Sequence, residues 1–414
     1  MSRQKKLIAL MWVGAGIAAV AVWASRRGAD AIEEPRGAPG SPVIVSDETP
    51  DSPNAELPPA SGDAQSPTQY RGDARHSGQS PFLGPSEGGL AWRFETEGII
   101  SAQVVADERG FIYVGSHDHF FYALGNGGRE RWKRDLGDRI YSTAAIDGEG
   151  NVYVGSDADA VWSFRRNGDQ RWRVDVDGDA DTGIALGEDG IVFGAGQALW
   201  FVEFDGTVRW RKGLGGKIFA TPSIDADGNI YVGCQDDHMY SFAPDGEQRW
   251  VYRTNDDNDA SPMLDEDGNI YFGSDDHHVY ALNTRGEVKW SVDLDGMVRA
   301  PMALGRDGSI LVGVFGPRPR VVSLDRETGE TRWFFPVTVA DTTEIGVASG
   351  PVVDAGGNIY FGAHDDYIYA LAPTGELRWA FATEGDVDAS PVILSTGELV
   401  VGSDDHHVYA IALR

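Results

Sequence analysis

Residues 265–304 read DEDGNIYFGSDDHHVYALNTRGEVKWSVDLDGMVRAPMAL. Apolar and polar residues alternate in three short stretches, at 269–273, 278–282 and 287–292, and Asp-Gly and Arg-Gly pairs mark the turns. A fourth apolar run follows at 300–304. This stretch therefore predicts four short β-strands in one repeat unit.

Eight tryptophans recur along the chain at intervals of 38 to 46 residues. They are Trp92, Trp132, Trp172, Trp210, Trp250, Trp290, Trp333 and Trp379. A constant period of about 40 residues with four strands per period is typical of a β-propeller blade.

The two ends of the repeat region complement each other. Residues 394–414 contain the middle strands of a blade but stop before any tryptophan strand, and residues 90–105 supply that strand. A closed ring avoids the unpaired ends of an open stack. We therefore expect an all-β fold, an eight-bladed β-propeller of four-stranded blades whose last blade is closed by strands from both termini.

A recurring motif gives the chain a family resemblance. Tyr280-Ala281-Leu282 is followed by Gly286 and Trp290, and the pattern recurs before Trp132, Trp250 and Trp379. This motif, with the lead-in at 70–78, resembles the PQQ-like β-propeller repeat family over about residues 68–414. The resemblance implies that the eight tryptophans dock between blades. It also implies either a BamB-like scaffold or a quinoprotein enzyme, since this fold carries both.

The N-terminal region predicts export. Arg3, Lys5 and Lys6 precede an uncharged apolar run from Leu7 to Ala24, and we interpret residues 1–27 as a signal-anchor or a signal peptide. The length of the run favours an anchor, the only membrane contact that we expect. Residues 28–67 predict a disordered linker rich in Pro, Ala and acids, and 68–414 the propeller, which we expect to be monomeric. The predicted location is the bacterial cell envelope, with an inner-membrane anchor and a periplasmic propeller, or outside the cell if the signal is cleaved.

Charge and cysteine content exclude some functions. The net charge is −29, and nucleic-acid binding is not expected because phosphate contacts need cations. Cys234 is the only cysteine, so no intramolecular disulfide can form. Its position matches that of Ser274 in the next repeat, which indicates a small strand residue rather than a nucleophile.

Aspartates and histidines recur in the loop between the second and third strands of the blades. In such a fold these loops emerge on the same face as the blade-to-blade crossings. Clusters of this kind can bind divalent metals. An aspartate repeated at one turn position is also a common turn former, and both interpretations stay open. The metal candidates are Asp276, His277, His278, Asp405, His406 and His407.

The sixth repeat departs from the pattern, which indicates either drift or a partner surface. Its loop, 315–320, reads FGPRPR, and the following crossing is the longest. The partner-binding candidates are Phe315, Arg318, Arg320, Asp341 and Glu344.

Two function classes follow from the resemblance. The first is a non-catalytic envelope scaffold that binds a protein partner. The second is a PQQ- and calcium-dependent alcohol or sugar dehydrogenase, with Asp259 and Asp388 as calcium candidates. Quinone enzymes of this shape commonly grip the cofactor with a disulfide of adjacent cysteines, which this chain lacks. We therefore favour the scaffold, and we predict no catalytic residue and no cofactor.

Overall fold

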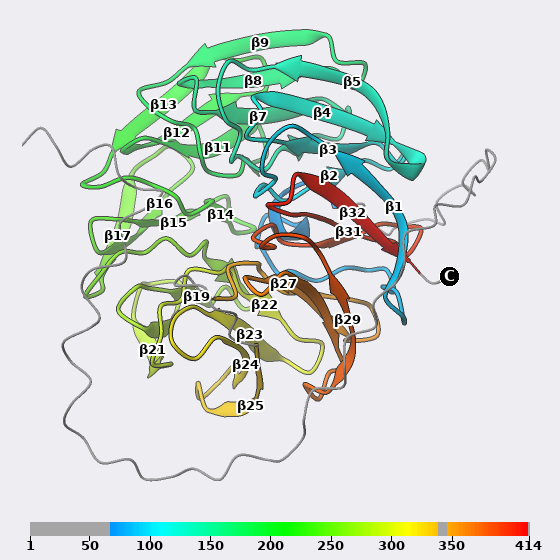
Figure 1. Ribbon diagram of the computed structural model, residues 1–414. Coiled ribbons are helices and arrows are strands. Elements are labelled where there is room, and N and C mark those ends of the chain that lie inside the picture. Colours follow the sequence, from blue (N-terminus) through cyan, green and yellow to red (C-terminus); the bar gives the residue numbers. More distant parts are fainter. Residues whose placement is uncertain (1–66, 338–345, 413–414) are drawn as a thin grey trace, which may run out of the picture. The chain divides into compact units, whose positions relative to one another are not determined.

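The computed structural model describes residues 67–337 and 346–412. In these ranges 32 strands form eight four-stranded antiparallel sheets, each running from an innermost to an outermost strand, and they are the blades of an eight-bladed β-propeller (Figure 1). The two 3-10 helices are η1 (Tyr70–Gly72) and η2 (Asn126–Gly128). Neither of these described helices has the length and apolar content needed to cross a membrane. The predicted N-terminal segment and linker, residues 1–66, lie outside the described residues.

Blades one to four follow one another along the chain. Blade one contains β2 (Val105–Ala106), β3 (Ile112–Gly115), β4 (Phe120–Gly125) and β5 (Arg129–Asp135). Blade two contains β6 (Ala145–Ile146), β7 (Val152–Ser156), β8 (Ala160–Phe164) and β9 (Gln170–Asp175). Blade three contains β10 (Ala185–Leu186), β11 (Gly190–Ala195), β12 (Ala198–Glu203) and β13 (Val208–Gly213). Blade four contains β14 (Ser223–Ile224), β15 (Ile230–Cys234), β16 (His238–Phe242) and β17 (Gln248–Arg253).

Blades five to eight repeat the plan. Blade five contains β18 (Met263–Leu264), β19 (Ile270–Gly273), β20 (His278–Leu282) and β21 (Val288–Asp293). Blade six contains β22 (Ala303–Leu304), β23 (Ser309–Val314), β24 (Arg320–Asp325) and β25 (Thr331–Pro336). Blade seven contains β26 (Val352–Val353), β27 (Ile359–Ala363), β28 (Tyr367–Leu371) and β29 (Leu377–Ala382). Blade eight contains β30 (Val392–Ile393), β31 (Leu399–Gly402), β32 (His407–Ala412) and β1 (Gly89–Glu95).

Blade eight confirms the predicted closure. The outer strand β1 pairs antiparallel with β32, in a register that places Trp92 opposite Ala410 and Glu95 opposite His407. The predicted innermost run at 300–304 is shorter as a strand than expected. Only Ala303 and Leu304 pair with β23, and residues 300–302 belong to the crossing that brings the chain back to the axis.

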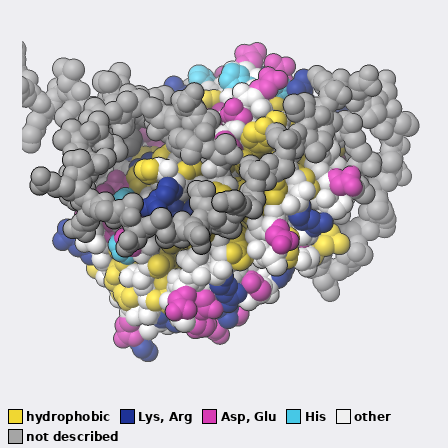
Figure 2. All heavy atoms as spheres, turned by 60° about the horizontal axis from the view of Figure 1, so that its bottom comes forward, with side chains coloured by type: hydrophobic (Ala, Val, Ile, Leu, Met, Phe, Trp, Pro, Cys, Tyr) yellow, Lys and Arg dark blue, Asp and Glu magenta, His cyan; other side chains and the backbone are white. Residues whose placement is uncertain are grey.

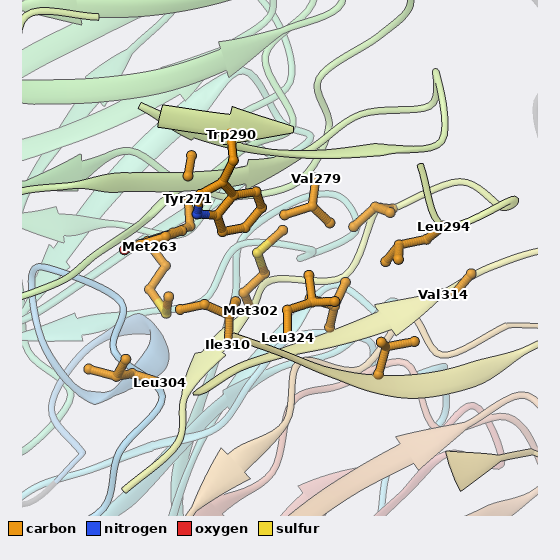
Figure 3. Close-up of a cluster of buried hydrophobic side chains, with 14 residues drawn as sticks. Met263, Tyr271, Val279, Trp290, Leu294, Met302, Leu304, Ile310, Val314 and Leu324 are labelled. Atoms are coloured by element: carbon orange, nitrogen blue, oxygen red, sulfur yellow. The ribbon is translucent and has the colours of Figure 1, made fainter. Parts of the chain in front are cut away.

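Apolar side chains from neighbouring blades meet in cores between the sheets. In one such core Trp290, Tyr271 and Met263 of blade five pack against Ile310 and Leu324 of blade six (Figure 3). The first three strands of a blade are almost wholly buried, while the outermost strand alternates, with exposed residues between inward-facing ones. This gradient explains why period-2 alternation in the sequence is clearest in the tryptophan strands.

Each tryptophan of the repeat packs on a glycine next to its own blade, which supports the predicted docking. A Cβ built on Gly329 of blade six would lie 2.7 Å from Cε3 of Trp290, and the Trp290 Nε1 donates to Arg326 O at 2.8 Å. The eight pairs are Trp92–Gly128, Trp132–Gly168, Trp172–Gly206, Trp210–Gly246, Trp250–Gly286, Trp290–Gly329, Trp333–Gly375 and Trp379–Gly88. Gly286 also has a φ of +77°, so both the turn and the indole require glycine there.

Residues 67–82, here called the plug, run along the inner strands before the first blade begins. In six blades an N–H group of the innermost strand donates a hydrogen bond of 2.7–2.9 Å to a backbone carbonyl of the plug. These blades are one, two, four, five, six and seven, and the carbonyls belong, in the same order, to Pro67, Thr68, Ala74, Arg75, Ser77 and Gly78. In blade three, Leu186 N donates to the Gln69 side chain at 3.2 Å. The plug therefore satisfies the inner edge of seven blades.

The propeller has two distinct faces. The loops between the second and third strands of each blade lie with the blade-to-blade crossings, as Asp275 N donating to Asp257 O at 2.9 Å illustrates. We call this side the crossing face. The hairpin face carries the turns between first and second strands, such as 225–229 and 265–269, and the plug contacts it through Arg306, whose Nη2 donates to Ser80 O at 2.5 Å.

Candidate functional site

The candidate site is a ring of side chains that surrounds the axis on the crossing face. A blade contributes the residue two positions after the glycine near the end of its second strand, and a crossing contributes a residue shortly before the next innermost strand. We call this set the axial girdle. Its members include Ser101, His117, Tyr141, Asp157, Asp181, Gln235, Asp259, Asp275, Arg299, Phe315, His364, Asp388 and Asp404.

Neighbouring girdle residues contact one another across the blade boundaries, usually at a separation of 24 residues. Gln235 Nε2 donates to Asp259 Oδ2 at 3.2 Å. Arg299 grips Asp275 with two nitrogens, Nε at 2.8 Å from Oδ1 and Nη2 at 2.5 Å from Oδ2. The repeat period thus places equivalent loop and crossing positions side by side around the axis.

The sector of the girdle at blades six to eight mixes aromatic, basic and acidic groups. The Arg299 guanidinium lies 5.8 Å from the centre of the Phe315 ring, and Phe315 meets His364 edge-on with ring centres 5.3 Å apart. His364 Nε2 in turn forms a short hydrogen bond with Asp388 Oδ1. These four girdle residues are therefore held by one another.

Ser101 and His117 form a contact that sequence reasoning missed. Ser101 Oγ lies 3.0 Å from His117 Nε2, and the imidazole packs on Tyr141 with ring centres 4.1 Å apart. In form this is a nucleophile beside a base. Burial and, to a smaller extent, repulsion by Arg139 lower the pKa of His117 to about 4. Attraction by Asp388 and Asp118 opposes this shift but does not cancel it. An imidazole of that pKa is a weak general base at neutral pH, so the contact is poorly suited to activate the serine.

Burial raises the pKa of several carboxyl groups in the girdle. Burial, with the charges of Asp388 and Asp386 added, raises the pKa of Asp404 to about 7. Burial and the neighbouring Asp275 raise the pKa of Asp259 to about 6. Asp157 and Asp181 share a hydrogen bond, and burial raises the pKa of both carboxyl groups. The girdle therefore carries less negative charge than its formal count indicates.

The aspartates among the predicted metal candidates have structural partners. Asp276 accepts bonds from the backbone N–H of His278 and Asn255, both at 3.0 Å, and from the Tyr280 hydroxyl at 2.6 Å. Asp405 accepts equivalent bonds from His407, Glu384 and Tyr409. Each of these aspartates fastens its loop to its own blade and to the preceding crossing, as the turn-former interpretation expects.

The positions of the histidines in these loops also agree with a structural role in the turns. His277 and His406 occupy the left-handed turn position, with φ of 75° and 73°, and both are exposed. His278 and His407 each place Nδ1 2.9 Å from the backbone carbonyl of the aspartate two residues earlier. The two triplets belong to different blades, five and eight, and metal binding at them stays a prediction.

Two clusters of carboxylates do converge, at positions near those predicted. Carboxylate oxygens of Asp257, Asp259 and Asp275 lie within 4.8 Å of one another, as do those of Asp237, Asp256 and Asp257. The first cluster includes Asp259, one of the two calcium candidates. However, Arg299 already neutralises Asp275 in that cluster. The other calcium candidate, Asp388, lies apart from both clusters and is bonded to His364.

The partner-binding candidates have unequal surroundings. Arg318 is an exposed cation whose guanidinium pairs with Asp295. Arg320 donates to the backbone carbonyl of Leu294, which ties its loop to the crossing between blades five and six. Phe315 is a girdle residue held between Arg299 and His364. Asp341 and Glu344 lie outside the described residues.

Charges of both signs are interspersed on the surface. In the space-filling view, acidic side chains lie beside histidines at the upper edge, and Lys and Arg side chains are scattered among acids below (Figure 2). Several of these cations form ion pairs with acids, for example Arg332 with Asp307 and Asp325 at 3.0 and 2.8 Å.

The repeat architecture agrees with one family model, described as outer membrane protein assembly factor BamB. It matches residues 82–180, 165–297, 257–333 and 317–414, which together span the whole ring. The chain belongs to this family. No curated protein matches the chain in sequence.

Solved structures share the fold of this BamB-family chain at low identity. BamB from Moraxella catarrhalis is 16% identical, with a TM-score of 0.67, and the match covers 79% of this chain and 100% of that one. A europium-containing methanol dehydrogenase is 12% identical, with a TM-score of 0.71 and coverage of 85% and 99%. The quinohemoprotein alcohol dehydrogenase from Comamonas testosteroni is 14% identical, with a TM-score of 0.73 and coverage of 84% and 80%. At these identities the likeness shows the fold alone.

Proposed function

We propose that this protein is a non-catalytic scaffold of the bacterial cell envelope that binds a protein partner on its crossing face. The observation that carries the proposal is the asymmetry of the axis. The plug is bonded to seven blades on the hairpin side, which leaves the crossing face as the accessible end of the axis. The loops between its second and third strands are short, from 196–197 in blade three to 315–319 in blade six, and loops of this length offer little chain from which to build a deep pocket.

Membership in the family of an outer membrane protein assembly factor supports an envelope location and a partner protein. The apolar run at 7–24 supports export, with the propeller anchored to the inner membrane or released after cleavage.

The charge of the crossing face indicates what kind of partner fits. Asp256 and Glu384 are exposed there, and the girdle behind them is rich in carboxyl groups. A partner with a basic docking surface would gain from this potential, and its association should weaken as salt is raised.

Photo-crosslinking in the cells that produce the protein tests the docking face. A photoreactive residue is placed at His277, His406 or Arg318 on the crossing face, and at Asp227 or Thr396 on the hairpin face as matched exposed controls. The proposal expects a discrete crosslinked partner from the first set only. Crosslinks mainly from the hairpin face, or from neither, would contradict it.

The alternative, a quinone- and calcium-dependent dehydrogenase, is motivated by the shared fold and by the Asp257–Asp259–Asp275 cluster. The residues at the axis fit these groups poorly. Arg299 occupies the carboxylate that a calcium ion would need, and a quinone bearing several carboxylates would face Asp157, Asp181, Asp388 and Asp404. We therefore derive no reaction step through them.

Calorimetric titration of the purified protein with pyrroloquinoline quinone in calcium separates the two functions. If the protein is a scaffold, we expect the titration to release no heat beyond the heat of dilution. Saturable binding with one quinone per chain would overturn it and would justify a screen for alcohol and sugar oxidation.

A further inference from the structure

A small cavity lies beside the plug, at the end of the axis opposite the girdle. Its volume is about 30 Å³, and its lining includes Pro67, Arg71, Gln103, Val352 and Ile393. A single water needs roughly 10–15 Å³ of such volume, so the cavity has room for one chloride-sized ion. We call it the plug cavity.

Arg71 projects from the plug into the channel and is only 3% exposed. Its Nη1 donates to Gly350 O at 2.8 Å, and its Nη2 donates to Met302 O at 3.2 Å and to Pro351 O. Close packing holds the guanidinium in place, since a Cβ on Gly78 would lie 2.4 Å from Nη2 and one on Gly350 2.8 Å from Nη1. Within the described residues, Nε of this cation has no hydrogen-bond partner.

Gln103 supplies a second unused donor. Its side chain is 3% exposed, and Arg71 N donates to Gln103 Oε1 at 3.3 Å, which assigns the amide oxygen to that side. The amide nitrogen Nε2 is then left without a partner among the described residues. Two buried donors that line one cavity favour an occupant that accepts hydrogen bonds.

The eighth blade contributes a third donor. In blades one to seven an innermost-strand N–H bonds to the plug, and the corresponding residue of blade eight is Ile393, which lines the cavity. No plug carbonyl in residues 67–82 accepts a bond from Ile393 N. Within the described part of the chain, the series of plug contacts therefore stops short of blade eight, at this cavity.

Arg71 has a nearby carboxylate, Asp73, that attracts its charge without forming an ion pair with it. No carboxylate in residues 67–337 and 346–412 forms an ion pair with it, and nearby Asp73 accepts bonds from Arg75 and Ser77 instead. Burial lowers the pKa of Arg71 to about 10, so the group is still charged at neutral pH. A buried cation with no anion in direct contact is costly, and an anion beside it would offset that cost.

We propose that the plug cavity binds one small monovalent anion of chloride size, held by Arg71 Nε, Gln103 Nε2 and Ile393 N. The ion completes the ring of plug contacts at blade eight and neutralises the buried guanidinium. Plug docking, and with it the stability of the closed propeller, therefore depends on the anion.

Thermal unfolding of the purified full chain tests this proposal. Sodium chloride is compared with sodium gluconate at equal ionic strength, because gluconate is too large for the cavity. We expect a saturable rise of Tm with chloride, as for any ligand bound only by the folded state. An identical Tm in the two salts at every concentration would overturn the proposal.

The variant Gln103→Glu supplies a built-in negative charge at the cavity. Its Tm in gluconate should approach that of the wild type in chloride, and its response to chloride should vanish. Gln170→Glu, at an exposed position on β9, makes the same charge change and should keep the chloride response. An unaltered chloride response in Gln103→Glu would place the ion elsewhere.

A bromide soak of wild-type crystals provides a readout that does not depend on the variant folding. An anomalous peak within hydrogen-bond distance of Arg71 Nε and Gln103 Nε2 is the expected result. Ordered water at that position without an anomalous peak would refute the anion.

Discussion

The indole of Trp379 packs on Gly88, which precedes the first strand of the ring. A Cβ built on Gly88 would lie 2.9 Å from Cε3 of the indole, and the Trp379 Nε1 donates to Pro85 O, 294 residues away in sequence, at 3.0 Å. The other seven tryptophans make the same kind of contact with a neighbouring blade. Blade seven thus docks on the N-terminal end of the ring as any blade docks on the next.

Replacing Trp379 by Ala should lower the free energy of unfolding by about 3–5 kcal/mol, because a large buried side chain is lost from the closing interface. Urea denaturation followed by circular dichroism measures the change. The control is Val288→Ala, at a position 46% exposed, which should stay within about 0.5 kcal/mol of wild type. Equal midpoints for wild type and Trp379→Ala would show that this contact does not close the ring.

Replacing Tyr280 by Phe should lower stability by about 1 kcal/mol at neutral pH, since Asp276 loses a buried hydrogen bond. Burial opposes ionisation of Asp276, but bonds from Tyr280, Asn255 and His278 outweigh it and hold the pKa of this carboxyl below its usual value. The stabilisation is therefore present above the unfolded pKa of about 3.9 and is lost as the pH falls through the folded value. Urea midpoints at pH 7 and pH 3 check this, and a difference between Tyr280→Phe and wild type that grew on acidification would contradict it.

Asp404→Asn should raise stability at alkaline pH. The pKa of Asp404 is raised to about 7, so the folded state binds this proton more tightly than the unfolded state does. The contribution of the group is fully present below about pH 4 and is lost as the pH rises through 7. We expect a Tm about 1–2 °C above wild type at pH 8.5 and no gain at pH 4. A gain of equal size at both values would point to a cause other than titration.

Replacing residues 67–82 by a Gly-Ser segment of equal length should expose the inner edges of the blades. Amide hydrogens of Ala106, Ile146, Leu264 and Leu304 should then exchange faster, because their carbonyl partners belong to the plug. The Val279 amide, in the β20–β21 ladder, is the internal control. Uniformly faster exchange at all of these sites would indicate global destabilisation rather than loss of the plug.

Arg318→Glu and Arg320→Ala should separate partner binding from folding. Arg318 is 71% exposed, so reversing its charge should change partner affinity while leaving Tm within about 1 °C of wild type. Arg320→Ala removes a bond to Leu294 O and should lower the Tm as well. Crosslinking yield and thermal unfolding of the two variants provide the readouts. A lower Tm for Arg318→Glu than for Arg320→Ala would contradict the prediction that Arg320, and not Arg318, contributes to folding stability.

The blade plan was predictable because its determinants are local. Alternation within strands such as 278–282, turn glycines such as Gly286 and the recurring tryptophans all report short-range geometry. The partner of Gly286 was not predictable in the same way. That glycine also seats Trp250 of the preceding blade, and this contact follows only from how two sheets pack.

The plug and the girdle were largely beyond sequence reasoning. The lead-in at 70–78 contributed to the family resemblance, but its contacts with the inner strands were not predictable, because the plug binds them mainly through backbone carbonyls, which every residue has. Girdle partners did leave a signal. In three bonded pairs the two residues are 24 positions apart, a correspondence that is visible once the repeats are aligned. The pairs are Gln235–Asp259, Asp275–Arg299 and His364–Asp388.

The closure of blade eight has a consequence for the order of events in synthesis. A ribosome releases the plug and β1 before any other part of the propeller, yet β1 has no strand partner until β32, the last strand of the ring, has been made. The earliest segment made is thus the last to find its place, and a chain truncated before residue 407 would leave both β1 and the inner face of blade eight unmatched. Unlike an open repeat array, which can fold from one end, this ring should close in a late step, once the strands of all eight blades have been made.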